Sequence, residues 1–445
     1  MPEGILTTVP RPVLVQHMIT SLERYWPRQS HRLKSLPVKA MPFPSALGPL
    51  RLVAVRLPDW ADETGIEGNL LVPTECCPGA PAPVWDQIDW WLAAFLLLEC
   101  WHEREREIRH GPVHSYSFRL KEWDARAWDR AWVNRIALFI REWAARREGE
   151  AATILFGALP KPRICMTHDV DAVKKTWAIR TKQGAFLAFN SARLLVRGNT
   201  RGALNHLAHA ARFVSARNDW WTIPKMQQLE REAGIRSRFH FYADSRRKTP
   251  KRWLLDPSYD VAEARFRGLL SELAEGGWEI GLHPAYDAWQ SSNLIEAQRR
   301  RLQSVSPVQV NSCRQHWLRF SWADTWRAQA GAGIREDTTL MFNDRPGFRA
   351  AAALSWTPWN TLENCSLTIR SLPTVLMDSQ FYDYETLDVE TRQLTLRHWT
   401  DEIKAVRGEI AVLWHPHTIT ADYGWGDGYR ELLAQVAECE ACEIQ

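Results

Sequence analysis

The fold of this chain is decided by the stretch Arg163-Ile164-Cys165-Met166-Thr167-His168-Asp169-Val170-Asp171. Its apolar residues predict a short buried strand that begins after Pro162. Two carboxylates, Asp169 and Asp171, follow at the C-terminal end. In parallel α/β folds the loops that leave the strand ends converge at this edge, and chemistry is performed there. The simpler interpretation is that the two acids only cap a turn or the next helix.

The chain beyond this strand alternates strand-like and helix-like segments. The helical patterns at 222–233 and 261–275 each end at a glycine, which is a common C-terminal stop. Strands are predicted at 164–168, 237–242, 278–283, 308–313, 333–336, 367–372 and 410–415. Because roughly seven strand–helix units follow one another, we predict an α/β fold with a closed or nearly closed parallel barrel.

A second domain is expected before the barrel, since 445 residues are too many for one ordinary core. Residues 1 to about 80 mix strand-like runs, such as 50–55, with many prolines, and 85–147 is helical. The glycines and prolines between 147 and 162 mark the boundary. We therefore predict an N-terminal α+β domain at 1–157 and the barrel at 158–445.

An insertion follows the first barrel strand. It combines apolar residues with a high density of lysine and arginine, which predicts a basic helical hairpin at about 172–217, over the barrel mouth. Such a hairpin could hold a phosphate-bearing lipid or nucleotide carrier, or make peripheral contact with an anionic membrane. The alternative is a solvated lid with a basic surface. The basic residues are Lys174, Lys175, Arg180, Lys182, Arg193, Arg197, Arg201, Arg212 and Arg217.

Composition excludes several classes of protein. The formal net charge of +4 is too small to indicate a nucleic-acid binder. No apolar run is long enough for a transmembrane helix, and the N-terminus has no secretory signal pattern. The eight cysteines lack paired metal spacing, apart from a lone Cys439 and Cys442 pair. Thiols without a signal peptide favour a reducing compartment, so a cytoplasmic location is expected. The 24 tryptophans suit stacking on sugars but equally suit large apolar cores.

Ionisable residues follow most of the predicted strands. Stability alone would favour apolar strand ends, so their convergence at one end of a barrel indicates a site. A carboxylate with imidazoles is the ligand set of zinc or a similar divalent ion. A second carboxylate can accept a proton from water, and an imidazole can protonate the leaving group. This chemistry is metal-assisted hydrolysis of an acyl group. The residues are Asp169, Asp171, His283, Asp287, Arg314, His316, Asp337, Asp378, His415 and His417.

Four ordered segments, at 167–171, 279–284, 314–316 and 413–415, resemble the polysaccharide deacetylase family of carbohydrate esterases. The Asp-x-Asp first motif resembles a subgroup associated with bacterial surface polysaccharide synthesis. The resemblance covers about residues 160 to 420. It implies a distorted (β/α)7 barrel, preceded here by the smaller α+β domain. It also implies hydrolysis of N-acetyl, or sometimes O-acetyl, groups on a sugar, a glycan or a carrier-linked saccharide, with a divalent metal expected to be zinc.

The resemblance also implies individual roles. Asp169 corresponds to the catalytic base, Arg314 to the residue that orients the base, and His415 to the general acid. The metal ligands would be Asp171, His283 and Asp287. Substrate contacts are expected from His316, Asp337, Arg349, Asp378 and Trp414.

Two departures from the family pattern leave alternatives open. Val170 separates acids that are usually adjacent, so either Asp169 or Asp171 could be the base. Asp287 stands where the family usually has a second histidine, and either Asp287 or His316 could complete the metal site. If metal binding is lost, the barrel would be a catalytically silent glycan-binding or assembly protein. A glycosidase would use an acid pair without a metal, and the histidine-rich set argues against it.

Overall fold

The computed structural model describes residues 6, 8–64, 66, 68–79, 83–196, 198, 200–385 and 387–441. Residues 1–5, for which no signal pattern was expected, and Cys442 of the predicted cysteine pair lie outside the described residues. The described cysteines are free thiols. Among the described helices, none combines the length and the apolar character needed to cross a bilayer.

The barrel is built from one parallel sheet with the order β10-β7-β6-β5-β4-β3-β12-β11. The predicted first strand, β3, lies in its middle and pairs with the last strand, β12, on one side and with β4 on the other. The strands are β3 (Arg163–Val170), β4 (Arg238–Phe241), β5 (Glu279–Leu282), β6 (Ser312–Cys313), β7 (Glu336–Asp337), β10 (Arg370–Ser371), β11 (Thr374–Met377) and β12 (Glu409–Leu413).

A single segment closes this sheet. β10 pairs with β7 at one edge and β11 pairs with β12 at the other, yet only Leu372 and Pro373 separate them. Backbone hydrogen bonds from Leu372 to Asp337 and from Ala411 to Pro373 continue the two pairings through the gap. Because β10 and β11 are two parts of one interrupted strand, the eight named strands form seven strand positions, or staves, around the barrel. The predicted distorted (β/α)7 barrel is confirmed.

The predicted strand at 367–372 was misplaced. Only its last part, β10, belongs to the barrel, and the sixth stave continues through β11. Pro373 interrupts it because proline has no N–H to donate to a ladder. Upstream of β10, β9 (Cys365–Ser366) pairs antiparallel with β8 (Trp359–Asn360) outside the barrel. The prediction at 308–313 is shortened to the two-residue strand β6, and the strand predicted at 333–336 lies further along the chain, at β7.

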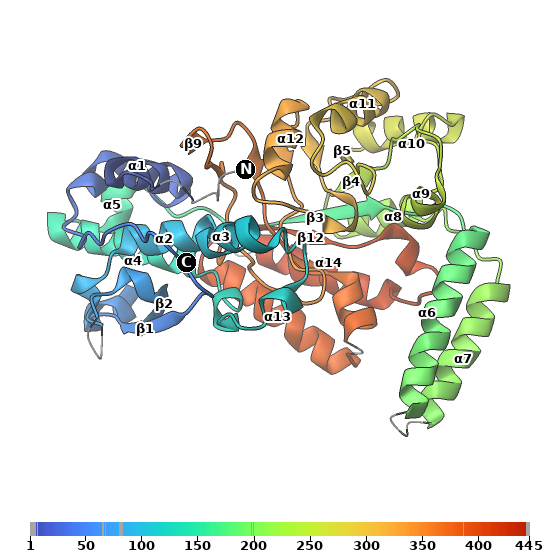
Figure 1. The fold of residues 1–445 in the computed structure, drawn as a ribbon, viewed down its shortest axis with the longest axis horizontal. Helices are drawn as coiled ribbons and strands as arrows, with labels where there is room; N and C mark the ends of the chain where they lie inside the picture. The colour runs from blue at the N-terminus through green and yellow to red at the C-terminus, as the bar shows by residue number, and fades with distance from the viewer. Residues whose placement is uncertain are drawn as a thin grey trace.

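Helices cover the outside of the barrel (Figure 1). Three of them begin with a capping side chain: Thr249 accepts from the N–H of Arg252, Ser291 from that of Leu294, and Asp388 from that of Thr391. They are α8 (Ile223–Glu232), α9 (Pro250–Leu255), α10 (Ala264–Glu275), α11 (Ser292–Gln303), α12 (Thr325–Gly331), α13 (Val389–Ala405) and α14 (Gly426–Ala441).

The N-terminal part combines five helices with a two-stranded antiparallel hairpin. Every residue of α2 is buried, as expected of a helix that is apolar all round. The elements are α1 (Arg11–Ser21), β1 (Leu52–Arg56), β2 (Asn69–Pro73), α2 (Trp90–Leu98), α3 (Trp101–His110), α4 (Trp132–Glu148) and α5 (Ala152–Phe156).

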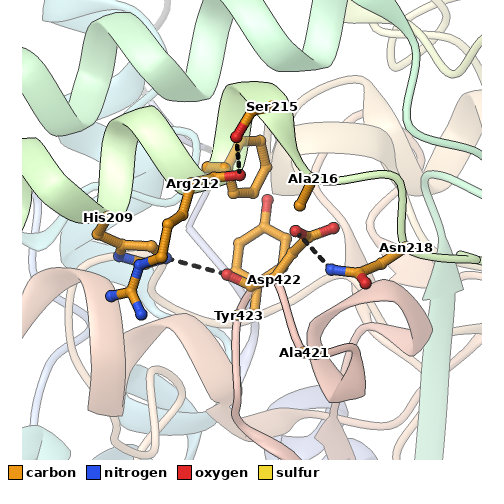
Figure 2. A pocket seen from close by; sticks show the side chains of 9 residues that line it. His209, Arg212, Ser215, Ala216, Asn218, Ala421, Asp422 and Tyr423 are labelled. Carbon is orange, nitrogen blue, oxygen red and sulfur yellow. Dashed lines mark hydrogen bonds between the residues drawn. The ribbon is translucent and has the colours of Figure 1, made fainter.

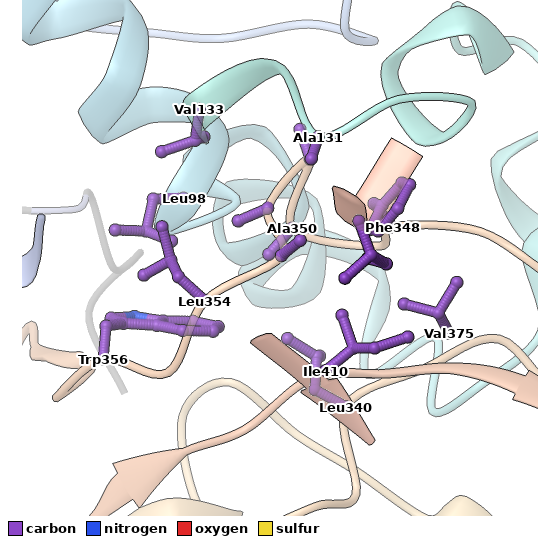
Figure 3. Close-up of a cluster of buried hydrophobic side chains, with 14 of the residues drawn as sticks. Leu98, Ala131, Val133, Leu340, Phe348, Ala350, Leu354, Trp356, Val375 and Ile410 are labelled. Atoms are coloured by element: carbon purple, nitrogen blue, oxygen red, sulfur yellow. The ribbon is translucent and has the colours of Figure 1, made fainter. Parts of the chain in front are cut away.

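The N-terminal part and the barrel share a continuous apolar core. In Figure 3, Leu98 of α2 and Val133 of α4 lie against Leu354, with Ile410 of β12 beneath. Buried ion pairs reinforce this contact: Arg135 of α4 pairs with Glu402 of α13 at 2.7 Å. The division into domains at residue 157 stays a prediction, because the packing is continuous across it.

A helical hairpin projects from the C-terminal end of β3 (Figure 1). Its helices are α6 (Trp177–Val196) and α7 (Thr200–Ser215), which pack against each other. A small apolar core, separate from the main one, lies within and at the base of the hairpin. It consists of Ala172, Leu187, Ala210, Phe213 and Trp220.

Candidate metal and acid–base site

Three side chains that follow the ends of three strands converge at the mouth of the barrel. Asp171 follows β3, His283 follows β5 and His316 follows β6. One ligand atom from each lies within 4.8 Å of those of the others. Asp171 and Asp169 are two residues apart, so an extended chain directs both side chains to the same face. Both carboxylates accordingly lie near the His283 ring.

Backbone carbonyls fix the orientation of the two imidazoles. The Nδ1 of His283 donates to the carbonyl of Arg314 at 2.8 Å, and the Nε2 of His316 donates to that of Leu255 at 2.7 Å. In the neutral form, the other nitrogen of each ring carries a lone pair. Those nitrogens, His283 Nε2 and His316 Nδ1, lie 2.7 Å apart.

The donor set fits a divalent cation. Asp171 Oδ1 lies 3.2 Å from His283 Nε2 and 3.3 Å from His316 Nδ1, and it is a buried oxygen without a hydrogen-bond partner. These three atoms each direct a lone pair at the others and carry no hydrogen in the neutral imidazole form. They therefore repel one another unless a proton or a metal ion lies between them. Burial lowers the pKa of His283, but Asp169 and Asp171 outweigh it and raise that pKa. Two nitrogens and a carboxylate suit zinc better than magnesium or calcium.

Asp169 lies deeper than Asp171, beside a guanidinium and two imidazoles. Its Oδ1 is 3.5 Å from Arg314 and 3.4 Å from Nδ1 of His240, and its Oδ2 is 3.8 Å from Nδ1 of His283. Burial raises the pKa of Asp169, but His283, Arg314 and His240 reverse this and hold the pKa far below its usual value. Asp169 therefore stays ionised at neutral pH.

Arg314 is fully buried and joins three staves of the barrel. It donates to Thr167 Oγ1 at 2.7 Å, to Thr374 Oγ1 at 2.8 Å and to the carbonyl of Thr338 at 3.0 Å. These bonds hold the guanidinium beside Asp169. The position fits the predicted role of a residue that orients the base.

His415 faces Asp171 from the last strand, with its Nε2 3.6 Å from Asp171 Oδ2. Its Nδ1 donates to Asp378 at 2.8 Å, and Asp378 also accepts from the His415 N–H and from Thr418. Burial lowers the pKa of His415, but Asp378, Asp171 and Asp169 outweigh it and raise the pKa to about 10. The ring is thus protonated at neutral pH and can donate. Asp378 thus orients this histidine, and its contact with substrate stays a prediction.

Asp287 is not part of the converging group. It forms a two-pronged ion pair with Arg246, which also binds Asp244. The second of the two sequence alternatives, His316, occupies the position beside His283 and Asp171. An open cavity of about 350 Å³, lined partly by Arg246, Asp287 and Leu255, lies next to this group.

Three other predicted substrate contacts are buried. Asp337 accepts from Trp326, Gln329 and Thr339. Arg349 pairs with Glu103 of α3 and donates to the carbonyl of Met341, which ties the N-terminal part to the barrel. Trp414 packs under the site against Tyr382 and Tyr429. These side chains serve packing in the structure, and their contact with a saccharide remains a prediction.

Two functional candidates were missed in the sequence, His240 and Trp317. His240 lies on β4, one strand from Asp169, and no polar neighbour in the sequence marked it. Trp317 follows His316 with φ of 58°, a left-handed conformation that is unusual for a bulky residue. Its half-buried ring lies beside His316, and the Nζ of Lys182 from α6 lies 4.4 Å from its centre. An aromatic ring held there suits stacking on a sugar.

His168 of the first motif is structural. Its Nδ1 donates to the carbonyl of Trp414 at 2.6 Å, and its Nε2 donates to Glu230 of α8 at 2.6 Å. Glu230 also accepts from Tyr429 of α14. This buried network ties the first and last strands to two outer helices.

Comparison with solved structures identified distant resemblances. A protein of Mycobacterium smegmatis assigned as a polysaccharide deacetylase is 17% identical over 63% of this chain and 86% of that one, with a TM-score of 0.37. The chitin deacetylase of Colletotrichum lindemuthianum is 11% identical over 63% and 84%, with a TM-score of 0.31. BA3943, a CE4 family pseudoenzyme of Bacillus anthracis, is 12% identical over 62% and 61%, with a TM-score of 0.27. No protein-family model and no curated protein matches the chain. The fold assignment rests on the strand order and on the closure of the sheet.

Proposed function

We propose that this protein is a metal-dependent hydrolase that removes an N-acetyl, or an O-acetyl, group from a sugar, in bacterial surface polysaccharide biosynthesis. The observation that carries the proposal is the convergence of Asp171, His283 and His316 between a carboxylate and a protonated imidazole. A purely structural site gives no reason to place a base and an acid on either side of three metal-ligating atoms.

The side chains divide the reaction between them. Asp169, held ionised by Arg314, accepts the proton of the water whose oxygen attacks the acyl carbon. His415, held protonated by Asp378, gives a proton to the sugar nitrogen or oxygen as its bond to that carbon breaks. Acetate and a free amine or hydroxyl are the products. A divalent ion held by Asp171, His283 and His316 would supply Lewis-acid polarisation of the acyl carbonyl.

Metal binding provides the first test. Chelator-treated protein should take up a single equivalent of Zn²⁺ in a calorimetric titration. Asp171→Ala, His283→Ala and His316→Ala should each weaken the affinity at least about 100-fold, which is the upper range for loss of even an indirect partner. Asp287→Ala is the matched control and should bind like the wild type.

Two results would count against the proposal. Undiminished binding in Asp171→Ala and His283→Ala would place the metal elsewhere. If Asp287→Ala lost the metal and His316→Ala kept it, the ligand set would be the other one foreseen from the sequence. Acetate release from N-acetylated and O-acetylated oligosaccharides then separates a deacetylase from a glycan-binding protein, which would bind these compounds without cleaving them.

A further inference from the structure

The α6–α7 hairpin concentrates positive charge. From 172 to 218 the sequence contains nine lysines and arginines and no aspartate or glutamate. The whole chain has 56 basic and 52 acidic residues, so the remainder of the molecule carries a net charge of −5. The hairpin is therefore a cationic projection from an otherwise anionic protein. Near a negatively charged surface, the molecule would orient with the hairpin toward that surface.

The distal half of the hairpin also exposes large apolar side chains. Phe189, Leu195 and Val196 on the last turns of α6 are 65%, 53% and 89% exposed. Leu204 and Leu207 on the first turns of α7 are 66% and 54% exposed. Several large apolar side chains that face water at one end of a hairpin indicate a surface with a partner. Arg193, Arg197 and Arg201 flank the turn between the helices in the sequence.

The base of the hairpin is anchored, so its tip is held away from the body. Asp422, in the loop before α14, accepts from Lys175 at 2.7 Å and from Trp220 at 2.7 Å. Figure 2 shows the cavity of about 670 Å³ at this base, where Asn218 donates to the Asp422 carboxylate and His209 to its carbonyl. Lys175 is thus part of the anchor and is not available to a partner.

We propose that the hairpin tip docks this protein on an anionic lipid bilayer. The apolar side chains at the ends of α6 and α7 would enter the headgroup layer, while the arginines around the turn meet lipid phosphates. A second copy of the chain fits less well, because two acid-free cationic hairpins repel each other. A nucleic acid would match the charge but would leave the apolar side chains in water. This docking is independent of the chemistry at the barrel mouth.

Vesicle co-sedimentation of the full-length protein tests the proposal. The protein should pellet with vesicles of equal parts phosphatidylcholine and phosphatidylglycerol, and far less with phosphatidylcholine alone. Replacing Arg193, Arg197 and Arg201 with glutamine should weaken binding about fivefold per charge. That loss should shrink at high salt, where exposed charges are screened.

A second variant separates the apolar contribution from the charge. Phe189→Ser/Val196→Ser/Leu204→Ser should reduce binding at low and high salt alike, with an unchanged circular dichroism spectrum. The matched control is Phe118→Ser/Ile154→Ser/Leu362→Ser, which removes equally exposed apolar side chains outside the hairpin and should bind like the wild type. Equal binding by all variants would overturn the proposal. A wild-type dimer that Phe189→Ser/Val196→Ser/Leu204→Ser converts to a monomer would also overturn it. Tight binding to a DNA oligonucleotide, with no binding to vesicles, would do the same.

Discussion

The carbonyl oxygens of Arg314 and Leu255 determine which ring nitrogen of His283 and of His316 faces Asp171. Each carbonyl takes one ring N–H, so the remaining nitrogens turn their lone pairs toward Asp171. Such indirect partners fix the tautomer and the ring orientation of metal-binding histidines. Sequence reasoning could nominate the histidines but not the carbonyls, because a backbone acceptor carries no residue signature. Sequence reasoning also left open whether Asp287 or His316 completes the ligand set. The structure shows that the carboxylate of Asp287 binds Arg246, which lies 41 positions away in the sequence.

The pairing of His415 with Asp378 leads to a prediction for catalysis. In Asp378→Asn the amide cannot both accept from Nδ1 and stabilise the imidazolium, so His415 should become a poor acid. The turnover number for acetate release should fall about 10²- to 10⁴-fold, the usual contribution of a positioned acid or base, while zinc affinity stays the same. Asp427→Asn, at an exposed carboxylate, is the control. If Asp378→Asn turned over substrate at the wild-type rate, His415 would not be the general acid.

At the scale of the element, β5 shows how closely the strands approach inside a small barrel. A Cβ on Gly281 would lie 2.5 Å from His240 Cδ2 and 2.6 Å from Ser312 Oγ. Only glycine therefore lets His240 lie between β4 and β5 and face Asp169. This constraint could not be predicted from the sequence, because no residue pattern records how closely two neighbouring strands approach.

Gly281→Ala should consequently destabilise the protein by about 1 to 3 kcal/mol, as overpacking of a well-packed core does. Urea unfolding monitored by circular dichroism measures the change. Gly268→Ala is the control, because nothing lies within 4 Å of its added Cβ on α10 and alanine favours a helix by about 0.5 to 1 kcal/mol. If Gly281→Ala unfolds at the wild-type urea concentration or above it, the close approach at Gly281 is not a constraint.

For the whole molecule, the parallel barrel could be predicted because each stave has a local signal, an apolar run followed by a polar strand end. β3 and β12 carry such runs and were recognised within a few residues. The closure could not be predicted, because it depends on one segment that pairs with both edges around Pro373. The site was found through polar residues at strand ends, and the same rule selected Asp337, whose side chain turns outward to Trp326 and Gln329 of α12. Sequence pattern alone does not distinguish the inner from the outer face of a two-residue strand.

The network around Glu230 links the barrel closure to the outer helices, and it should make stability depend on pH. Burial raises the pKa of Glu230, but His168, Tyr429 and Trp278 outweigh this and lower the pKa below its usual value. In the unfolded chain the pKa of a glutamate is about 4.3. A group whose pKa is lower in the folded state stabilises the fold above its unfolded pKa and loses that contribution as the pH falls. The free energy of unfolding should therefore decrease as the pH is lowered through about 4.3.

Glu230→Gln tests this dependence directly. At pH 7 it should cost about 1 to 3 kcal/mol, because buried donors lose an acceptor. Its free energy of unfolding should then fall less between neutral and acidic pH than that of the wild type, since the carboxyl group that titrates is gone. Urea titrations at both pH values measure the two slopes, with Glu122→Gln, at an exposed side chain, as the control. A loss of stability in acid as large in Glu230→Gln as in the wild type would mean that other buried carboxylates, such as Glu99 with its pKa lowered beside His17 and Arg104 despite burial, govern acid unfolding.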